Sequence, residues 1–270
     1  MTKKLLYQFD TDPLPAVFDN VVAYDGGADH ITAYGGVTAA NVGGLVEGAI
    51  FTRGPKDKKN TALFIGGGNM TAGQALLGAV QAKFFGKFRV SVMFDCNGSN
   101  TTAAAAVAWL AHGRLLRGKH AVVLAGTGPV GQRAAALLSS EGATVTITGR
   151  KLDAVQTATA SIKSRFGIDV QARAAATNEE RAVAIAGAHI VLATGAAGIT
   201  LLNRASGRSI PPWNWWRMRM HRHLPASRGW PWPIAAPRAT ARYCSARWGS
   251  ERSSSRCTGP ALPGCSIRTT

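Results

Sequence analysis

A glycine-rich turn in the middle of this 270-residue chain limits the folds that are open to it. The run Gly126-Thr127-Gly128-Pro129-Val130-Gly131 (GxGxxG) follows an apolar stretch, His120–Ala125, and opens a helical pattern over Val130–Ser140. In such a turn the first glycine allows a tight bend, the second lets the backbone approach a pyrophosphate, and the third lets the helix pack closely on the strand. Because a second strand pattern follows at Ala143–Thr148, the segment predicts a dinucleotide site at the helix N-terminus and not a plain structural turn.

The residues after the second strand indicate which dinucleotide is bound. Domains that bind NAD place an Asp or Glu about 20 residues after the glycine-rich turn, where it accepts hydrogen bonds from the ribose. This chain has Gly149, Arg150 and Lys151 there. A guanidinium and an ammonium suit a 2′-phosphate, so the sequence favours NADP. The alternative is a pair of solvated charges in front of a helix.

A further turn of small residues follows the strand predicted over His189–Ala193. Its residues are Thr194-Gly195-Ala196-Ala197-Gly198. In a doubly wound sheet the carboxyl end of the fourth strand lies at the switch point, next to the bound nicotinamide. Thr194 and Gly195 would let the cofactor come close, and an ordinary turn explains them equally well.

Short β-rich runs alternate with helical patterns along residues 1–202, which is typical of an α/β fold with parallel sheets. Ala-rich Asn100–Leu116 predicts the helix that joins an N-terminal α/β domain, residues 1–100, to a Rossmann-type dinucleotide-binding domain, residues 101–202. The other expected elements are helices over Met70–Phe85, Leu152–Phe166 and near Asn178–Ala186, and strands over Lys4–Phe9, His30–Tyr34, Thr61–Ile65, Arg89–Phe94 and Ile168–Arg173.

Two polar clusters in the N-terminal domain offer candidate binding residues. One runs from Asp19 to Tyr34, and the other, Asp95 to Thr102, follows a strand and opens the joining helix. We expect both clusters in loops that face the dinucleotide, although the Ser, Asn and Thr residues of the second are also typical helix caps. His30 has no partner at metal-ligand spacing, so no metal site is predicted. No nucleophile elbow is visible either.

The charge of the chain is unevenly distributed. The formal net charge is +17, and residues 203–270 alone contain 12 Arg, no Lys and a single acid, together with six of the seven Trp. Arginine without any lysine is unusual for a selected basic patch, so this composition indicates that two unlike sequences meet near residue 203. The segment shows no hydrophobic period and no strand pattern, and we expect an irregular, disordered tail.

Several segments of residues 1–202 together resemble a known family. They are DTDPLPAVFDNVVAYDGGADHITAYGGVT, FIGGGN, NGSNTTAAAA, VVLAGTGPVG and TGRK. They are similar to the NADP-dependent methylene-tetrahydromethanopterin dehydrogenase of methylotrophic bacteria, which also accepts methylene-tetrahydrofolate. The resemblance implies a two-domain α/β subunit that holds the tetrahydropterin in an interdomain cleft. It places the fingerprint glycines at Gly126, Gly128 and Gly131 and the phosphate-facing pair at Arg150 and Lys151.

The resemblance also carries expectations about the substrate and the setting. It makes five residues candidates for binding the pterin: Asp19, Asp25, His30, Asn100 and Thr102. The expected partners are a tetrahydromethanopterin or tetrahydrofolate derivative and, for an in-frame chain, further copies of itself. No apolar run approaches the length of a membrane span and the start lacks a secretory h-region, so we expect a cytoplasmic protein with no membrane partner.

Two other readings stay open at this point. One is another NADP-dependent dehydrogenase on the same scaffold, and the other is a basic nucleic-acid-binding protein that uses the Arg- and Trp-rich tail.

The genetic code suggests a different origin for the tail. Read one base earlier, the codons of 213–225, 245–256 and 257–270 permit ELVADADASPPA, FGALGIGALKLT and LHRACIARLFDPDD, which look like the missing C-terminus of the family.

We therefore expect residues 203–270 to be out of frame. A Rossmann sheet would then lack its fifth strand, and the strand that contains Val191 would become an apolar edge. Loss of a strand exceeds the stability margin of most domains. We accordingly expect the chain to have little or no dehydrogenase activity.

Overall fold

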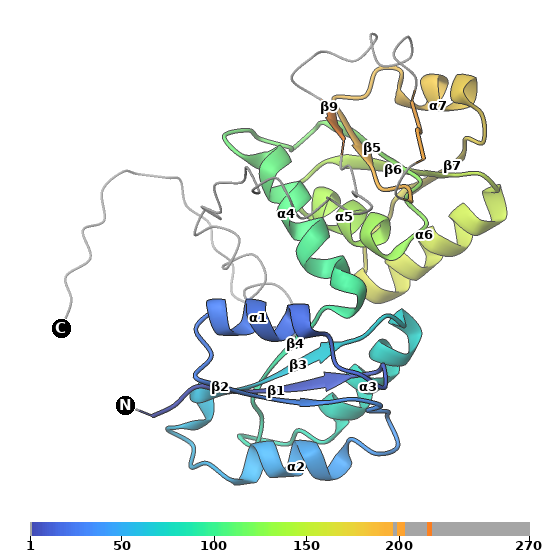
Figure 1. Ribbon diagram of the computed structural model, residues 1–270. Helices are drawn as coiled ribbons and strands as arrows, with labels where there is room; N and C mark the ends of the chain where they lie inside the picture. The colour runs from blue at the N-terminus through green and yellow to red at the C-terminus, as the bar shows by residue number, and fades with distance from the viewer. Residues whose placement is uncertain (1, 197–198, 203–214, 218–270) are drawn as a thin grey trace, which may run out of the picture. The chain divides into compact units, whose positions relative to one another are not determined.

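The computed structural model describes residues 2–196, 199–202 and 215–217. They form two separate β-sheets whose strands are all parallel, with helices on their faces (Figure 1). The strand orders are β2-β1-β3-β4 and β7-β6-β5-β8-β9. The second order is that of a doubly wound dinucleotide-binding sheet. The α/β fold expected from the sequence is confirmed.

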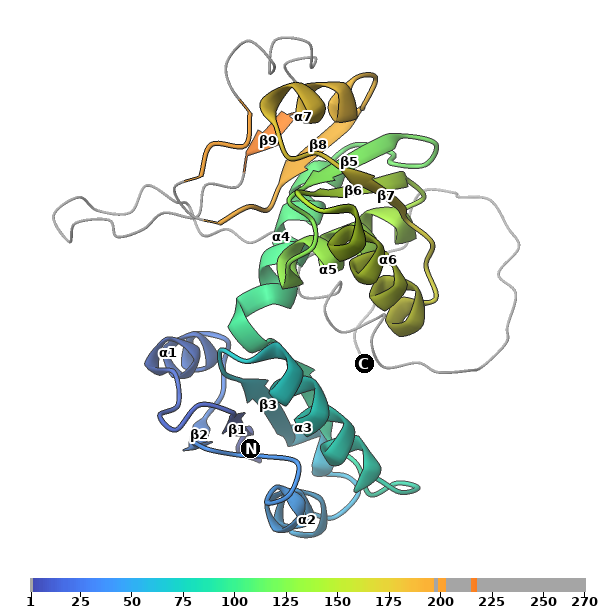
Figure 2. The ribbon, with the colours of Figure 1, turned by 90° about the vertical axis from the view of Figure 1, so that its right-hand side faces the viewer.

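The first sheet has β1 and β3 at its centre. Its buried side chains come mainly from these two strands and from helices α2 and α3. Helix α1 lies on the other side of this sheet from α2 (Figures 1 and 2). The core includes Phe9, Val46, Ile50, Leu63 and Leu76. The elements are β1 (Leu5–Asp10), α1 (Val17–Asp25), β2 (His30–Tyr34), α2 (Gly43–Phe51), the 3-10 turn η1 (Lys58–Asn60), β3 (Thr61–Gly66), α3 (Met70–Ala82) and β4 (Ser91–Phe94).

The second sheet follows a short 3-10 turn and the joining helix. Helices α4, α5 and α6 pack on one face of this sheet, and α7 packs on the other face (Figure 2). The elements are η2 (Cys96–Gly98), α4 (Ser99–Ala111), β5 (His120–Leu124), α5 (Pro129–Ser140), β6 (Thr144–Gly149), α6 (Leu152–Phe166), β7 (Gln171–Ala174), α7 (Asn178–Ile185), β8 (Ile190–Ala193) and β9 (Trp215–Arg217).

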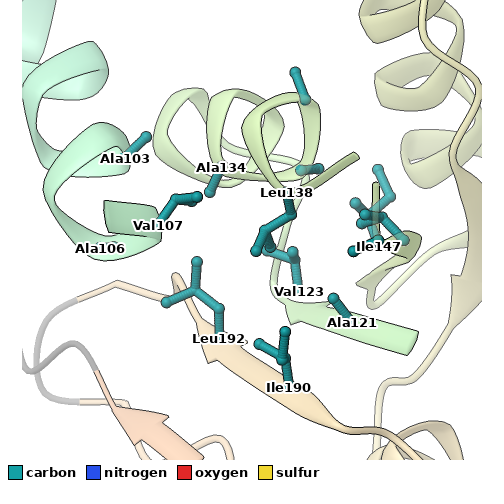
Figure 3. Packing of buried hydrophobic residues seen from close by; sticks show 14 of the residues in the cluster. Ala103, Ala106, Val107, Ala121, Val123, Ala134, Leu138, Ile147, Ile190 and Leu192 are labelled. Atoms are coloured by element: carbon teal, nitrogen blue, oxygen red, sulfur yellow. The ribbon is translucent and has the colours of Figure 1, made fainter. Parts of the chain in front are cut away.

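Strand β5 shows why its run of apolar residues is continuous. Ala121 and Val123 face α4 and α5, whereas Val122 and Leu124 face the side that holds α7. All four residues are completely buried. Figure 3 shows Val123 beside Leu138 of α5, with α4 packed against the same cluster. A strand covered on both faces must be apolar at every position.

The sequence analysis missed two helices, α1 and α2. The polar cluster that begins at Asp19 was expected to be a loop, and that expectation is wrong because Val17–Asp25 is helical. No residue of α1 is buried, and Phe18 is 76% exposed. Helix α2 has three glycines among nine residues, which lowers its intrinsic helix propensity. Val17, Phe18, Val21 and Val22 of α1 do have the spacing of one helix face, so this signal was overlooked, whereas the apolar residues of α2 are not confined to one side.

The fifth strand also differs from the expectation. Trp215–Arg217 lies in the segment for which no strand was expected, yet its backbone pairs parallel with β8, opposite Val191, Leu192 and Ala193. The expectation that β8 forms the edge of the sheet is therefore wrong. An exposed parallel edge presents unpaired N–H and C=O groups that can pair with any extended segment. The rest of the expected irregular tail, 203–214 and 218–270, lies outside the described residues.

None of the helices in the described part of the chain is both long enough and apolar enough to cross a membrane.

The packing of β8 predicts a large effect of one core substitution. Leu192 is fully buried among α4, α5 and β5, so Leu192→Ala should lower the free energy of unfolding by about 2–5 kcal/mol. The matched control is Leu152→Ala, because Leu152 is 45% exposed; this variant should change stability by less than about 1 kcal/mol. Urea unfolding of both variants measures the difference. Equal losses would contradict the assigned core.

Candidate functional site

The glycine-rich turn joins β5 to α5, as expected. A Cβ atom on Gly126 would lie 3.0 Å from Cβ of Ile147 on β6. A Cβ on Gly131 would lie 2.6 Å from Cα of Gly126. Side chains at both positions are therefore excluded, because the turn packs on β6 and the first turn of α5 packs on the turn itself.

Gly128 has a different environment. A Cβ atom there would meet nothing within 4 Å, so the backbone of this residue borders open space. Gly128 is also the N-cap of α5, no side chain caps this helix, and Pro129 stands at its first position. Uncapped N–H groups at a helix N-terminus attract anions. This open backbone fits the pyrophosphate of a dinucleotide.

Four of the predicted residues make packing or hydrogen-bond contacts in or beside the turn. The Thr194 hydroxyl donates hydrogen bonds to the carbonyls of Leu124 and Ala125, both at 3.1 Å. The carbonyl of Thr127 accepts a hydrogen bond from Gln132 Nε2 at 2.7 Å. Val130 packs against the buried cluster under α5, and a Cβ on Gly195 would lie 2.8 Å from Leu201 Cδ1. These contacts tie the turn to β8 and to the core under α5.

Arg150 and Lys151 lie at the carboxyl end of β6, between that strand and α6. Both residues are exposed. Because β5 and β6 are parallel neighbours, this end of β6 and the glycine-rich turn lie on the same edge of the sheet. Two cations thus stand one strand away from the uncapped end of α5.

Three carboxylates gather at the carboxyl edge of the first sheet; we call Asp10, Asp19 and Asp95 the acidic edge. Asp10 ends β1 and Asp95 directly follows β4. Asp19 comes from α1, and a Cβ on Gly66 would lie 3.3 Å from its Oδ2 and 3.5 Å from Oδ2 of Asp10. Ligands of open α/β sheets bind at this edge.

Two of these carboxylates are occupied by the protein itself. Asp10 accepts backbone hydrogen bonds from Asp12 at 2.9 Å and Ala16 at 3.1 Å. Asp95 accepts backbone N–H groups of Asn100 at 2.6 Å and Thr101 at 3.1 Å, and the Thr101 hydroxyl at 2.5 Å. Asp95 therefore acts as the cap of α4, a role that the sequence analysis assigned to the neighbouring Ser, Asn and Thr residues.

Asp19 is the member of the acidic edge that is partly open. Its side chain is half-buried, and burial, followed by repulsion from Asp10 and Asp95, raises the pKa of its carboxyl group. Buried Cys96 lies beside the same group, and burial raises the pKa of its thiol to about 12. The thiol donates to the carbonyl of Gly66 at 3.1 Å, so Cys96 is a protonated packing residue at neutral pH.

The five candidates for the pterin side lie at two different places. Asp19, Asn100 and Thr102 lie at or next to the carboxyl edge of the first sheet, where α1 and α4 begin. Asp25 ends α1, and His30 begins β2, where its Nε2 lies 2.9 Å from the Lys3 ammonium. The start of β2 pairs with the start of β1, so His30 lies at the amino edge and is not brought together with Asp19.

Asp10 and Arg133 were not predicted as members of this region, whereas Asp95 was predicted as the start of the second polar cluster. Asp10 could have been found, because it ends a strand of a parallel sheet and ligands bind at that edge. Arg133 carries no such signal, since it looks like an ordinary polar position of an amphipathic helix. Within the described ranges, no three His, Cys, Asp or Glu side chains gather in a way that could hold a metal ion.

Comparison with known proteins identifies the family. The profile described as "Methylene-tetrahydromethanopterin dehydrogenase, N-terminal" matches residues 17–97. The bifunctional protein MdtA of Methylorubrum extorquens is 58% identical over 208 residues, which cover 76% of this chain and 72% of that protein. The chain belongs to the methylene-tetrahydromethanopterin dehydrogenase family.

A second relative and a solved structure extend the comparison. The NAD(P)-dependent methylenetetrahydromethanopterin dehydrogenase of the same organism is 32% identical over 218 residues, 78% of this chain and 73% of that protein. Ornithine carbamoyltransferase from Pyrococcus furiosus superposes with a TM-score of 0.52 at 13% identity, over 84% of this chain and 74% of that one. This structural likeness concerns the two-sheet fold alone, and the family resemblance expected from the sequence is confirmed by the two relatives.

The geometry of the turn predicts opposite results for two alanine substitutions. Gly128→Ala should leave the melting temperature unchanged, because its Cβ meets no protein atom, and should weaken NADP binding at least about tenfold by filling the space beside the backbone. Gly131→Ala should destabilise the fold, because its Cβ would overlap Gly126. Thermal melts and NADP titration measure both effects. Unchanged NADP affinity in a stable Gly128→Ala protein would contradict the assignment.

Proposed function

We propose that this chain is built as a dehydrogenase that transfers a hydride from the methylene group of methylene-tetrahydromethanopterin, or of methylene-tetrahydrofolate, to NADP. The observation that carries the proposal is the 58% identity to MdtA. Because that match spans 76% of the chain, it includes residues 100–150 wherever it begins. The glycine-rich turn and the region after β6 therefore fall inside the similarity.

The described residues fit the cofactor. Gly126, Gly128 and Gly131 give the turn its shape, and the N-terminus of α5 would hold the pyrophosphate. Arg150 and Lys151 would hold the 2′-phosphate. When bound, NADP supplies the nicotinamide ring that accepts the hydride. Thr194, which braces the turn from β8, would lie on the nicotinamide side of the same edge.

The substrate chemistry explains why the site contains so little acid–base machinery. Loss of a hydride from a carbon between two nitrogens gives a cationic methenyl group, and no proton has to be removed in that step. The protein then has to position the substrate and to favour the developing positive charge. Asp19, backed by Asp10 and Asp95, offers negative charge at the carboxyl edge of the first sheet. Asp25, His30 and Thr102 stay predictions for the pterin side, as do self-association and a cytoplasmic location.

We also propose that residues 203–270 are encoded out of frame. The match to MdtA spans about the share of the chain that residues 1–202 make up. The position of β9 gives a second support. In the hidden string ELVADADASPPA, the apolar Leu, Val and Ala are encoded across codons 214–217, and Trp215–Arg217 is the segment that pairs with β8. Both reading frames thus encode a strand-forming run at the place of the fifth strand of the second sheet. The apolar run Leu-Val-Ala suits a buried parallel strand.

Activity of two full-length proteins tests both proposals. The 270-residue chain should show little reduction of NADP with methylene-tetrahydromethanopterin, and a gene with one base inserted near codons 203–209 should restore turnover. EDTA should not inhibit the restored protein. Formation of reduced NADP measures the outcome. Absence of turnover in the restored protein would refute the proposed reaction, and full turnover in the 270-residue chain would refute the frame assignment.

The two cations predict the choice of cofactor. Replacing Arg150 and Lys151 together with Ser should remove most of the preference for NADP over NAD, because each charge-assisted hydrogen bond to a phosphate contributes about 1.5–3 kcal/mol when well formed. Dissociation constants for both dinucleotides give the ratio. Arg117→Ser, a substitution of an exposed arginine before β5, is the control and should leave the ratio unchanged. A ratio that is unaffected by the double substitution would contradict the assignment.

The raised pKa of Asp19 predicts opposite effects on stability and turnover. A carboxyl group whose pKa is raised on folding does not reduce the free energy of unfolding at low pH, where it is protonated. Its ionised form lowers that free energy as the pH rises toward and through the folded pKa. Asp19→Asn should therefore raise the melting temperature at neutral pH, with a gain that shrinks toward acidic pH. The same variant should lower turnover about ten- to a hundredfold, because the negative charge is lost. A variant that is both less stable and fully active would contradict this role.

A further inference from the structure

Arg133 is a buried charge that the proposed reaction does not use. It is the fifth residue of α5, and 2% of its surface is exposed. Burial lowers the pKa of its guanidinium to about 10, so it is still charged at neutral pH. In the part of the chain that the structure describes, it forms no ion pair with a carboxylate at contact distance. Such a charge is costly unless hydrogen bonds hold it.

The partners of Arg133 come from both sides of the α4–α5 contact. Its Nε donates to Oδ1 of Asn100 at the start of α4, and its Nη1 donates to the carbonyl of Pro129 at 3.2 Å. The guanidinium also lies over the ring of Phe94, 5.7 Å from its centroid. Asn100 in turn donates from Nδ2 to the carbonyl of Phe94. One chain of contacts thus runs from the first turn of α5 to the end of β4.

These contacts connect the two halves of the site. Pro129 belongs to the glycine-rich turn, whereas Phe94 immediately precedes Asp95 of the acidic edge. The turn belongs to the second sheet and the acidic edge to the first sheet. We propose that Arg133, acting through Asn100, is a positioning residue that fixes the distance between the dinucleotide loop and the acidic edge. This inference rests on the proposed function, because hydride transfer is the step that needs this distance.

The physical reason is the steep dependence of transfer on geometry. A hydride moves only when the donor and acceptor carbons are held at near-contact distance, and a misplacement of about 1 Å can cost a hundredfold in rate. A buried network whose polar atoms have partners is rigid. Asn100 has both its carbonyl oxygen and its amide nitrogen engaged by the protein. Its place in the network therefore explains it without a contact to the pterin.

Kinetics of Arg133→Met distinguish positioning from a merely structural role. The variant keeps an unbranched apolar side chain in place of the arginine stem and removes the guanidinium; Arg117→Met, on an exposed residue, is the matched control. In the full-length protein that turns over, kcat should fall about a hundredfold, and the NADP dissociation constant should change less than about threefold. The isotope effect from a deuterated methylene group should rise, because transfer becomes rate-limiting. An unchanged kcat, or a loss of kcat that merely parallels a loss of folded protein, would overturn the proposal.

Asn100→Ala provides the second test. If both residues act in one network, the Arg133→Met/Asn100→Ala double variant should be no slower than the slower single variant, because effects of residues that act as a unit do not add. Multiplying losses would show two independent roles and overturn the proposal. Failure of the proposed function is distinguishable from both results, since the frame-restored protein without these substitutions would then show no turnover at all.

Discussion

Helices α4 and α5 pack closely because both carry alanines where they meet. Ala103 and Ala106 of α4 and Ala134 of α5 are buried in one cluster with Val107 and Leu138 (Figure 3). Small side chains reduce the distance between helix axes. The site depends on this contact, because α4 continues from the end of β4 and α5 continues from the glycine-rich turn. Asn100 and Arg133 can reach one another because the helices that carry them are in contact.

The charges of the site follow from this arrangement. Asp10 and Asp95 each accept hydrogen bonds from backbone N–H groups, which hold their carboxyl groups in place at the edge of the first sheet. Burial, followed by repulsion from these two carboxylates, raises the pKa of the Asp19 carboxyl group. Arg133 adds a buried positive charge on the side of α5. A site built of fixed charges suits a reaction in which a cation develops and no proton has to move.

The sequence predicted the regular parts of the fold well. Leu152–Phe166 and His30–Tyr34 have the expected bounds, because one has an amphipathic period and the other a short β-rich run between turn residues. Helix α1 was not predicted, because the polar residues from Asp19 onward were interpreted as a loop although Val17, Phe18, Val21 and Val22 have helical spacing. Strand β9 was not predicted, because its pairing depends on the open edge of β8 and not on its own composition.

The site was predictable where chemistry follows from local spacing. The GxGxxG turn and the Arg150–Lys151 pair could be read because each lies at a known distance from a strand end. The bridge between Arg133 and Asn100 could not, because it joins residues 33 positions apart through the packing of two helices. Asn100, by contrast, was predicted to bind the pterin because it stands in a polar cluster of the sequence. In the structure its side chain contacts Phe94 and Arg133.

The proposed reaction brings a methylene carbon and a nicotinamide ring together for direct hydride transfer. Methylene-tetrahydromethanopterin that carries deuterium on the methylene group provides the most direct test. After turnover by the frame-restored protein in ordinary water, mass spectrometry of the reduced NADP should find one deuterium on each nicotinamide ring for each deuterium lost from the substrate. Deuterium released into water, or reduced cofactor without label, would contradict direct hydride transfer.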